Sequence, residues 1–256
     1  MTKIKFAIVG CGRIAQRHAE HIHTYGELVA VCDTVVDKAN SLASKYAAKA
    51  YLSIDDMLQN EKGIDVVAVC TPNGLHATHA LKALETNKHV VIEKPMALSK
   101  ADCEKIIYKA LDQSKTVFCV MQNRYSPPSV WLKNIVESKT IGNIYMVQLN
   151  CYWNRDERYY KAGGWKGTQD LDGGTLFTQF SHWIDIMYWL FGDITNIQAK
   201  FADFNHQNST AFEDSGFVNF DFINGGMGSI NYSTAVYDKN LESSLTIVGS
   251  NGSIKV

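Results

Sequence analysis

The sequence has no excess of one charge and no long hydrophobic run. Its 256 residues include 25 Lys and Arg against 26 Asp and Glu, a formal net charge of -1. A near-neutral chain without a long basic run is not typical of proteins whose main partner is nucleic acid or an anionic membrane. No apolar stretch approaches the roughly 18 residues of a membrane span, and the first residues lack the apolar core and cleavage site of a signal peptide. We therefore expect a cytoplasmic protein.

Cysteine and histidine patterns of metal sites are also missing. The six cysteines form no CxxC pair. Three lie at the ends of apolar runs: Cys32, Cys70 and Cys119. Such thiols behave as small core hydrophobes in a reduced compartment. Of the eight histidines, His18, His21 and His23 lie close together but lack a partnering carboxylate or cysteine pattern. We predict no metal site and expect these three histidines at an exposed helix end.

The first half of the chain alternates short apolar runs with amphipathic segments. The apolar runs are 4–9, 28–32, 66–70, 90–92 and 117–120, and the helix-like segments are 13–25, 38–46, 76–86 and 100–114. Runs that are apolar on both faces are typical of a parallel sheet covered by helices. Ser53 and Ser99 each stand three residues before an aspartate, a pattern typical of helix starts. We predict an α/β domain over residues 1–121.

After about residue 121 the pattern changes to longer strand-like runs with alternating polar positions. These runs are 143–153, 194–202, 217–222, 228–234 and 244–248, with one helix-like segment at 175–191. Turn residues, such as the Asn-Gly-Gly at 224–226, separate the runs. We predict a second domain over residues 122–256, of the α+β class with a mostly antiparallel open sheet.

A glycine-rich turn follows the first apolar run. It reads Gly10-Cys11-Gly12-Arg13-Ile14-Ala15, a GxGxxA pattern. Gly10 permits a tight turn, Gly12 lets the backbone approach a pyrophosphate, and Ala15 lets the helix lie close to the sheet. The pattern predicts a Rossmann fold that binds a dinucleotide, although a glycine turn without function remains the alternative. The residues expected at the cofactor are Gly10, Gly12, Arg13 and Ile14.

A carboxylate at the end of the second strand selects the cofactor. Asp33 lies 21 residues beyond Gly12, where it can accept hydrogen bonds from both ribose hydroxyls of the adenosine. A phosphate about 4 Å from that carboxylate would cost several kcal/mol even at an effective dielectric near 20. Thr34, Val35 and Val36 supply no compensating cation. We therefore predict NAD rather than NADP.

Two further polar segments follow strands at the edge where open α/β sheets bind ligands. Glu93-Lys94-Pro95 follows the run 90–92, and Thr71-Pro72-Asn73 follows the preceding strand. In isolation Lys94 reads as a surface lysine paired with Glu93, but its position beside the predicted nicotinamide favours a functional role. This edge adds five residues to those expected at the cofactor: Thr71, Asn73, His76, Glu93 and Lys94.

A histidine interrupts an otherwise apolar helix-like segment. Helical spacing over 175–191 places Thr178, His182 and Asp185 on one side. A lone histidine in such a helix is more often a core residue with satisfied hydrogen bonds than a catalyst. This motif alone therefore does not assign a catalytic role to His182.

Together the three motifs resemble the glucose-fructose oxidoreductase/inositol dehydrogenase family of NAD(P)-dependent sugar oxidoreductases. The resemblance runs through essentially the whole chain, with GxGxxA at 10–15, EKP at 93–95 and a Gly-Gly…His-x-x-Asp pattern at 173–185. Segments 122–125, 151–160, 164–168 and 172–174 are most similar to the UDP-N-acetyl-2-amino-2-deoxyglucuronate dehydrogenases of that family. This implies NAD-dependent oxidation of the 3-hydroxyl of a UDP-linked 2-acetamido-2-deoxy-glucuronic acid to the 3-keto sugar, in surface-polysaccharide precursor synthesis.

The chemistry of alcohol oxidation assigns two catalytic roles. Hydride leaves the sugar carbon for C4 of nicotinamide while a base takes the hydroxyl proton, a step worth about 10²- to 10⁴-fold. His182, with an ordinary pKa of about 6.5, can accept that proton, whereas Lys94 starts near 10.4 and would need a strongly lowered pKa. We assign His182 as the base and Lys94 as the cation that orients the hydroxyl and stabilises the alkoxide.

Basic and aromatic side chains of the second domain are expected to bind the sugar nucleotide. The cations Arg155, Arg158 and Lys166 favour an anionic substrate over a free cyclitol or aldose, which remains an alternative. Aromatic rings that can stack on sugar or uracil are interleaved with them: Tyr125, Trp153, Tyr159 and Trp165. The expected substrate-binding residues are Asn123, Arg124, Tyr125, Arg155, Tyr159, Trp165, Lys166, Thr178 and His182.

The sequence departs from the family pattern in two places. Thr178 stands where the family usually has aspartate, and the chain stops at Val256, where relatives continue, so we expect a shortened second domain. A dinucleotide-binding relative without catalysis is therefore a further alternative, although retention of Lys94 and His182 argues against it. Two strands are expected to offer a mixed rather than wholly polar open face, the one with Tyr145, Val147 and Leu149 and the one with Phe217, Asn219 and Asp221. Relatives pair this sheet face across a two-fold axis, which implies a homodimer or homotetramer.

Overall fold

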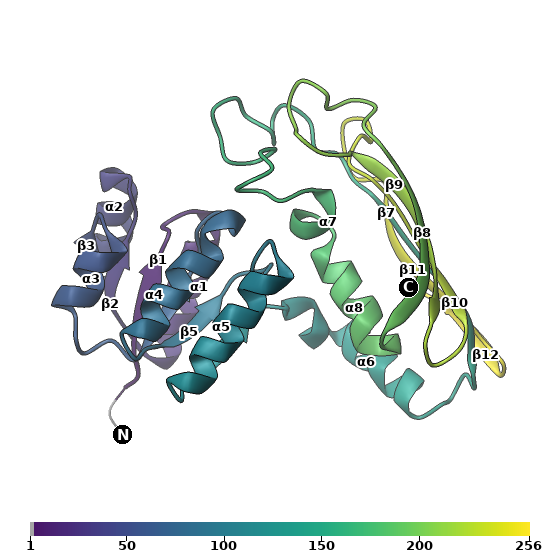
Figure 1. Cartoon of the computed structure of the whole chain (residues 1–256), viewed down its shortest axis with the longest axis horizontal. Helices are drawn as coiled ribbons and strands as arrows, with labels where there is room; N and C mark the ends of the chain where they lie inside the picture. The colour runs from purple at the N-terminus through teal and green to yellow at the C-terminus, as the bar shows by residue number, and fades with distance from the viewer. Residues whose placement is uncertain (1–2) are drawn as a thin grey trace. The chain divides into compact units, whose positions relative to one another are not determined.

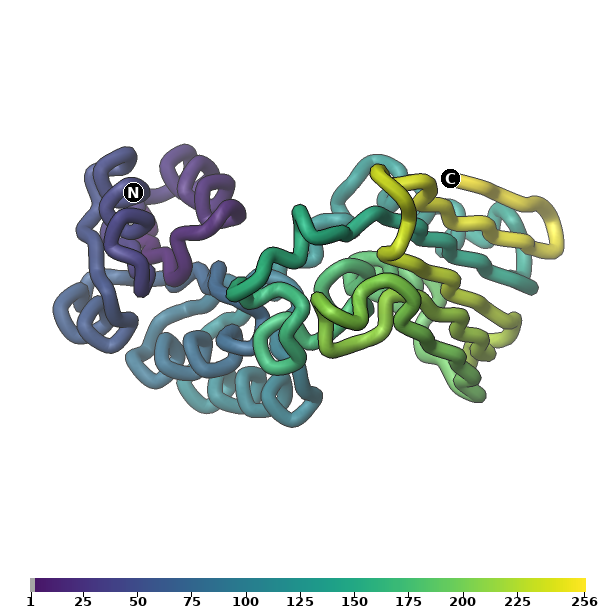
Figure 2. Tube along the Cα trace, turned by 90° about the horizontal axis from the view of Figure 1, so that it is seen from above, coloured from purple at the N-terminus to yellow at the C-terminus, as the bar shows by residue number. Residues whose placement is uncertain are grey.

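The computed structural model describes residues 3–256 and divides the chain into two compact units, Met1–Val120 and Met121–Val256 (Figure 1). The same division is visible along the Cα trace, where the purple and blue half and the green and yellow half fold separately (Figure 2). Among the described residues no helix is both long and apolar enough to cross a membrane.

The first unit is a parallel six-stranded sheet with strand order β3-β2-β1-β4-β5-β6. Its strands are β1 (Lys5–Val9), β2 (Glu27–Cys32), β3 (Lys49–Tyr51), β4 (Val66–Val69), β5 (His89–Ile92) and β6 (Val117–Cys119). Its helices are α1 (Arg13–Tyr25), α2 (Val36–Tyr46), α3 (Ile54–Asn60), α4 (His76–Glu85), α5 (Lys100–Asp112) and the short 3-10 helix η1 (Asn73–Leu75). All neighbouring strands pair in parallel, as the doubly wound fold requires.

Alternate residues of β1, a central strand of this sheet, face two different helix layers. Ala7 and Val9 lie in the core cluster that contains residues of α3, α4 and α5, whereas Ile8 packs with residues of α1 and α2. This two-sided burial explains why the strands read as continuous apolar runs, and the predicted α/β class is confirmed. The predicted helix starts also hold, since the hydroxyl of Ser53 accepts the N–H of Asp55 and that of Ser99 accepts the N–H of Asp102.

The second unit is a mixed sheet with strand order β12-β11-β7-β10-β9-β8. Its strands are β7 (Ile144–Tyr152), β8 (Ile194–Ala202), β9 (Ser215–Phe222), β10 (Met227–Ser233), β11 (Glu242–Gly249) and β12 (Gly252–Lys255). Its helices are α6 (Pro127–Glu137), α7 (Thr175–Thr178), α8 (Ser181–Phe191) and the short η2 (Gln122–Tyr125). Only β7 and β10 pair in parallel and the other neighbours are antiparallel, which confirms the predicted mostly antiparallel sheet.

Helices α6 and α8 cover one face of this sheet (Figure 1). Val147 and Leu149 of β7 are buried against residues of α8 such as Ile186. We expected the strand that carries Tyr145, Val147 and Leu149 to offer these side chains on a mixed, uncovered face. This was wrong for Val147 and Leu149, because odd positions of β7 turn toward the helices. Tyr145 has the same parity but lies near the start of the strand, where it is 56% exposed. The uncovered face carries Phe217, which is 61% exposed.

Several local features differ from the sequence-based expectation. The segment 175–191 is not one helix, since α7 ends at Thr178 and α8 begins at Ser181. Helix α6 and the edge strands β3 and β12 were not predicted. The start of α6 is nevertheless marked by Ser126, whose hydroxyl accepts the N–H of Ser129, and by the two prolines that follow it.

Candidate functional site

The glycine turn after β1 leaves room beside the first turn of α1. Gly10 has a φ of +89°, and a Cβ added there would lie 2.7 Å from the carbonyl carbon of Cys70, so only glycine fits. Gly12 differs, because a Cβ added to it would meet no atom within 4 Å. Gly12 is also the N-cap residue of α1 and supplies no side-chain hydrogen bond to it. The turn therefore presents free backbone space and a helix N-terminus, which together suit an anion.

The carboxylate of Asp33 is fixed at the end of β2 by two backbone donors. Its Oδ2 accepts the N–H of Cys11 (2.8 Å) and its Oδ1 accepts the N–H of Val35 (2.8 Å). The first bond joins Asp33 directly to the glycine turn. The structure thus brings together the two features that the sequence singled out for a dinucleotide.

His76 ties together two turns at the same sheet edge. Its side chain is buried, with Nδ1 2.6 Å from the carbonyl oxygen of Pro95 and Nε2 2.9 Å from that of Thr71. Burial lowers the pKa of His76, although both carbonyl contacts oppose this shift. His76 therefore holds the segments on which Thr71 and Lys94 lie, while Asn73 begins η1 between them and is itself buried.

Glu93 pairs with a histidine that we expected at an exposed helix end. The Nε2 atom of His18 on α1 lies 2.7 Å from Oε1 of Glu93, and the two side chains are only 16% and 11% exposed. That expectation was wrong for His18, because its position on α1 turns it toward the end of β5. Lys94 follows directly and donates its backbone N–H to Glu93 Oε2 (3.3 Å). The pair links the turn that carries Lys94 to the helix that begins at the glycine turn.

In the second unit, His182 lies in the first turn of α8 next to η2. Its Nε2 is 3.3 Å from Nε2 of Gln122. Arg124 of η2 binds Asp185 of α8 through two hydrogen bonds, at 2.8 and 2.5 Å. This bidentate ion pair fixes η2 against the helix that carries His182.

Thr178 contacts an aspartate on the preceding loop. Its Oγ1 donates to the backbone oxygen of Asp172 (2.9 Å) and also contacts the Asp172 carboxylate. Burial raises the pKa of Asp172, while the hydrogen bonds from Thr178 and the N–H of Gly167 oppose the shift. A carboxylate at position 178 would face that of Asp172, whereas the threonine hydroxyl can donate to it. This gives a physical reason for the departure from the family pattern.

Arg155 is a partly buried cation enclosed by aromatic rings. Its guanidinium carbon lies 4.8 Å from the ring centroid of Trp153 and 5.2 Å from that of Tyr159. Its Nε donates to Oε1 of Gln179 (2.6 Å). Burial lowers the pKa of Arg155, yet among residues 3–256 it forms no ion pair. Arg158 differs, since it is exposed and pairs with Asp156 at 2.6 Å.

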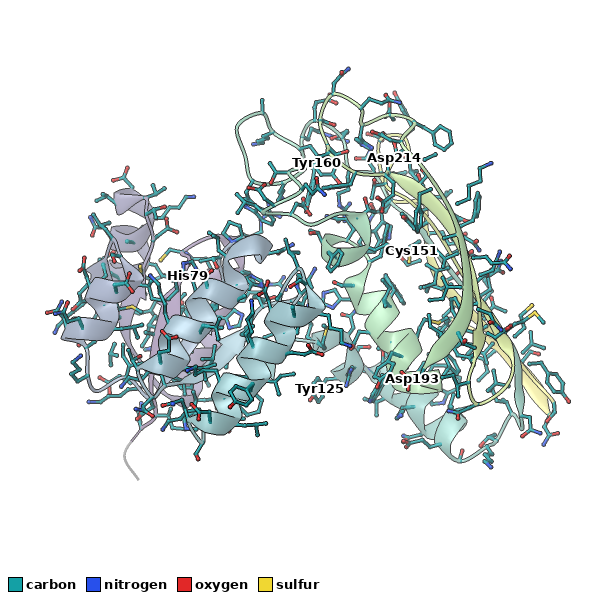
Figure 3. The ribbon with its side chains drawn as sticks, in the orientation of Figure 1. His79, Tyr125, Cys151, Tyr160, Asp193 and Asp214 are labelled. Atoms are coloured by element: carbon teal, nitrogen blue, oxygen red, sulfur yellow. The ribbon has the colours of Figure 1, made fainter. Side chains whose placement is uncertain are left out.

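The remaining expected substrate residues divide between two places. Lys166 Nζ lies 3.5 Å from the ring centroid of Tyr159, the same ring that Arg155 contacts, and Trp165 precedes Lys166 in the chain. Asn123 and the 83% exposed Tyr125 belong to η2. Tyr125 lies toward the opposite end of the second unit from Tyr160 (Figure 3).

Several side chains of the site were missed in the sequence. They are His18, Gln122, Asp172 and Gln179. Gln179 and Asp172 lie within or beside the 173–185 motif, so their position was a usable signal. His18 and Gln122 act through partners far away in the sequence, which spacing does not disclose.

Comparison with known proteins places both units in described families. Residues 4–121 match the family described as "Oxidoreductase family, NAD-binding Rossmann fold", and residues 130–255 match the "GFO/IDH/MocA C-terminal domain". The inositol 2-dehydrogenase of Salmonella typhimurium (strain LT2) is 34% identical over 196 residues, which cover 74% of this chain and 55% of that protein. The D-glucoside 3-dehydrogenase of Escherichia coli (strain K12) is 30% identical, over 88% of this chain and 68% of that protein. The chain thus spans little more than half the length of the inositol dehydrogenase.

A solved structure is more similar still. The WlbA dehydrogenase from Chromobacterium violaceum, in complex with NADH and UDP-GlcNAcA, superposes with a TM-score of 0.95 at 37% identity. The match covers 100% of this chain and 74% of that protein.

Proposed function

Because the chain belongs to the GFO/IDH/MocA oxidoreductase family, we propose that it oxidises a UDP-linked 2-acetamido-2-deoxy-glucuronic acid at its 3-hydroxyl, with NAD. In this proposal residues 1–121 bind the cofactor and residues 122–256 bind the sugar nucleotide. The product is the 3-keto sugar, a precursor for surface polysaccharide. The reaction takes place in the cytoplasm, in keeping with six cysteines that are all free thiols.

The residues present fit a bound NAD. Gly12 offers open space beside the N-terminus of α1 for a pyrophosphate, with Arg13 and Ile14 beginning the helix. Asp33 is held so that its carboxylate can accept ribose hydroxyls. When bound, NAD supplies the acceptor of the hydride that leaves C3 of the sugar. Glu93 and His76 hold the turn of Lys94 in place.

Two side chains of the protein then accept the hydroxyl proton and stabilise the negative charge that develops on the oxygen. His182 accepts the proton of the 3-hydroxyl, and the ammonium group of Lys94 orients this hydroxyl and stabilises the alkoxide. One hydride and one proton leave the sugar together, so the alcohol becomes a ketone and the charges balance. The direct contact of Gln122 with His182 orients the imidazole for this step.

The environment of Arg155 is the observation that supports a uronic acid as the substrate. A guanidinium that is desolvated, flanked by two aromatic rings and without an acidic partner among the described residues is suited to an anionic ligand. Arg124 and Arg158 are already paired with carboxylates. We therefore assign Arg155 to the C6 carboxylate of the uronic acid, and Lys166 with the rings of Tyr159 and Trp165 to the rest of the nucleotide sugar. Similarity to the WlbA dehydrogenase complex with UDP-GlcNAcA supports the same choice.

The test compares two sugar nucleotides. The kcat/KM for the UDP-linked uronic acid is expected to exceed that for neutral UDP-N-acetylglucosamine by about ten- to a hundredfold, the worth of one charge-assisted hydrogen bond. Reduction of NAD is followed by absorbance at 340 nm. Equal values would remove the uronic acid from the proposal. Good turnover of inositol or a free aldose, with none of either nucleotide sugar, would favour the cyclitol or aldose alternative.

A second copy of the chain is proposed to cover the open face of the second sheet. That face has a shallow depression lined by both apolar and polar side chains, among them Met146, Ile197, Asn219 and Met227. The flanking Phe217 is also exposed. A mixed apolar face of this kind fits a homodimer, or a homotetramer built from dimers.

A further inference from the structure

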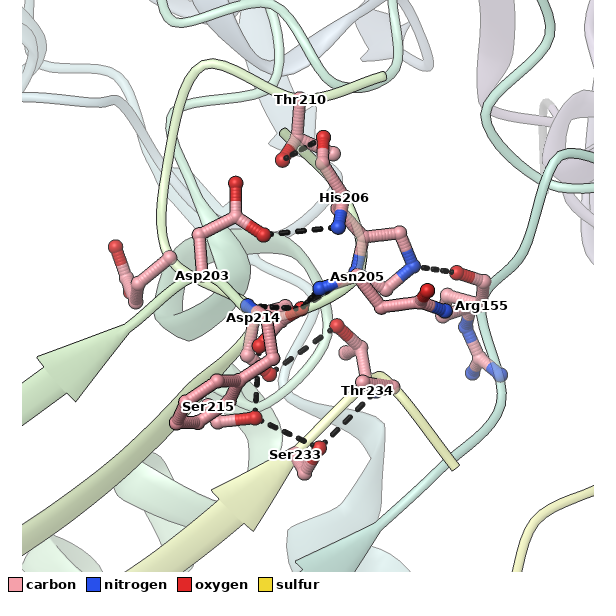
Figure 4. Close-up of polar contacts among 12 residues, drawn as sticks. Arg155, Asp203, Asn205, His206, Thr210, Asp214, Ser215, Ser233 and Thr234 are labelled. Carbon is pink, nitrogen blue, oxygen red and sulfur yellow. Dashed lines mark hydrogen bonds and ion pairs between the residues drawn. The ribbon is translucent and has the colours of Figure 1, made fainter. Parts of the chain in front are cut away.

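A buried histidine–aspartate pair lies in the loop between β8 and β9. His206 is 3% exposed and Asp214 is 1% exposed, and Nδ1 of His206 is 3.1 Å from Oδ2 of Asp214 (Figure 4). The same oxygen accepts the N–H groups of Phe204 (3.0 Å) and Asn205 (2.8 Å). The pair is therefore tied to the backbone of its own loop, at the end of the unit where Tyr160 lies (Figure 3).

Hydrogen bonds close a ring through this pair and the backbone of Arg155. Nε2 of His206 contacts the carbonyl oxygen of Arg155, 51 residues away in the sequence. The N–H of Arg155 donates to the carbonyl oxygen of Thr234 (2.9 Å), and the N–H of Thr234 donates to that of Asp214 (2.8 Å). Both polar groups of the Arg155 backbone are thus held by residues of distant segments.

The chemistry of these hydrogen bonds explains why a histidine and an acid stand at positions 206 and 214. Both nitrogens of His206 face oxygen atoms, one of the Asp214 carboxylate and the other of the Arg155 carbonyl. Burial alone would raise the pKa of Asp214, but donors from Asn205, Ser215, Phe204 and His206 lower it. The ionised Asp214 carboxylate is therefore stabilised in a buried place by the donors around it.

We propose that His206 and Asp214 are positioning residues for recognition of the anionic substrate. They fix the backbone of Arg155, and its guanidinium is thereby presented beside Gln179 and between the rings of Trp153 and Tyr159. This inference rests on the proposed function, in which Arg155 meets the substrate carboxylate. A guanidinium on a rigid backbone loses less conformational freedom when the ligand binds, which favours affinity.

A metal site is the competing interpretation of the same residues. Asp203, His206 and Asp214 each offer one ligand atom, and these atoms lie within 4.8 Å of one another. However, Oδ1 of Asp203 accepts the N–H of His206, Nε2 of His206 is engaged with Arg155, and Oδ2 of Asp214 accepts three N–H groups. An ion would have to displace these bonds, so the donors already present favour the positioning role.

The first test needs no substrate. Exchange of the guanidinium Hε of Arg155 with water is measured by NMR, with Arg155→Lys to assign the signal. We expect exchange to become about tenfold faster in His206→Leu and to change less in His206→Gln, whose amide can still donate one hydrogen bond. Gln207→Ala, an exposed change in the same loop, is the matched control. If His206→Leu lacks a cooperative thermal transition, His206→Gln carries the test. Unchanged exchange in the folded variant would overturn the proposal.

The second test separates binding from catalysis. The KM for the UDP-linked uronic acid is expected to rise about tenfold in His206→Leu and by a smaller factor in His206→Gln, with kcat and the KM for NAD changing less than about threefold in both. In an Arg155→Ala background either change should add little, since both positions act through one group. Independent, multiplying effects would contradict the proposal.

Failure of the unmodified protein to oxidise the uronic acid would instead defeat the proposed function and leave the NMR test in force. A Zn²⁺-induced rise in Tm that is lost in His206→Gln would establish the metal site and overturn the positioning role.

Discussion

His18 and Glu93 meet although 75 residues separate them, with Nε2 of one 2.7 Å from Oε1 of the other. The contact joins α1, which begins at the glycine turn, to the segment after β5 that carries Lys94. The glycine turn at 10–15 and the motif at 93–95 are therefore linked within the first unit by His18, which belongs to neither motif.

The pH dependence of stability should report this contact. Burial alone would raise the pKa of Glu93, but the hydrogen bond and charge of His18 and the N–H of Lys94 lower it below its ordinary value. Since the folded pKa is lowered, the contribution is fully present above the unfolded pKa of about 4.3 and is lost as the pH falls through the folded pKa. Urea unfolding of the unmodified protein should therefore lose more stability from pH 6 to acid pH than unfolding of Glu93→Gln. Parallel pH profiles for the two proteins would contradict this.

Alanine at the two glycines of the turn should have opposite consequences. Gly10→Ala places a Cβ 2.7 Å from the backbone of Cys70 at a positive φ, so we expect a loss of about 1–3 kcal/mol in the free energy of unfolding. Gly12→Ala meets nothing in the protein and should leave stability within about 0.5 kcal/mol. NAD affinity should nevertheless fall in Gly12→Ala, because the methyl group enters the space required by the pyrophosphate. Thermal unfolding and calorimetric titration measure the two effects, and undiminished NAD binding by Gly12→Ala would remove the turn from the cofactor site.

Cofactor selection should depend on Asp33. The unmodified protein is expected to bind NAD much more tightly than NADP, and Asp33→Ala should narrow the difference by removing the repulsion of the 2′-phosphate. Calorimetric titration with both cofactors checks this, and Asp37→Ala, an exposed acid in the first turn of α2, serves as the control. Equal affinities in the unmodified protein would refute the assignment.

Catalysis should depend on Lys94 and His182 separately from cofactor binding. Lys94→Ala and His182→Ala are each expected to lower kcat by about 10²- to 10⁴-fold while NAD affinity changes little. Lys100→Ala is the control for loss of an exposed positive charge. Near-normal turnover in either active-site variant would exclude that residue from the mechanism. Loss of folding in His182→Ala would indicate that this histidine is a core residue.

The oligomer should depend on the open sheet face. Phe217→Asp is expected to shift a dimer or tetramer toward smaller species in light scattering at micromolar concentration. Tyr108→Asp, on α5 of the first unit and 72% exposed, is the matched control. A protein that is monomeric before any substitution would refute the proposed assembly.

The elements with a clear repeating pattern could be predicted from the sequence. The runs that became β1, β4 and β5 are apolar on both faces, and α1 begins and ends at the predicted residues. Helix α6 was not predicted, although Ser126 and the two prolines that follow it are typical of a helix start. At the break between α7 and α8, Thr178 contacts the preceding loop, and such contacts leave no periodic signal in the sequence.

Residues of the candidate site could be predicted where they lie at the ends of strands. They could not be predicted where a side chain contacts a residue far away in the sequence. Asp33 and Lys94 follow predicted strands, so their edge of the sheet could be inferred. The pairing of His18 with Glu93, and of Arg155 with Gln179, requires the folded arrangement of separate segments. The face of β7 was assigned wrongly because both of its faces contain apolar residues, and only packing decides which is covered.

The parallel pairing of β7 with β10 has a consequence for the order of folding. Asn150 and Asn231 are neighbours on these strands but 81 positions apart in the chain. Strand β7 leads directly into the segment that carries Arg155, yet its neighbour β10 is synthesised much later. A newly made chain therefore cannot complete this sheet until the residues of β10 have left the ribosome. This high contact order delays folding of the second unit, whereas the first unit can close its own sheet from residues synthesised earlier.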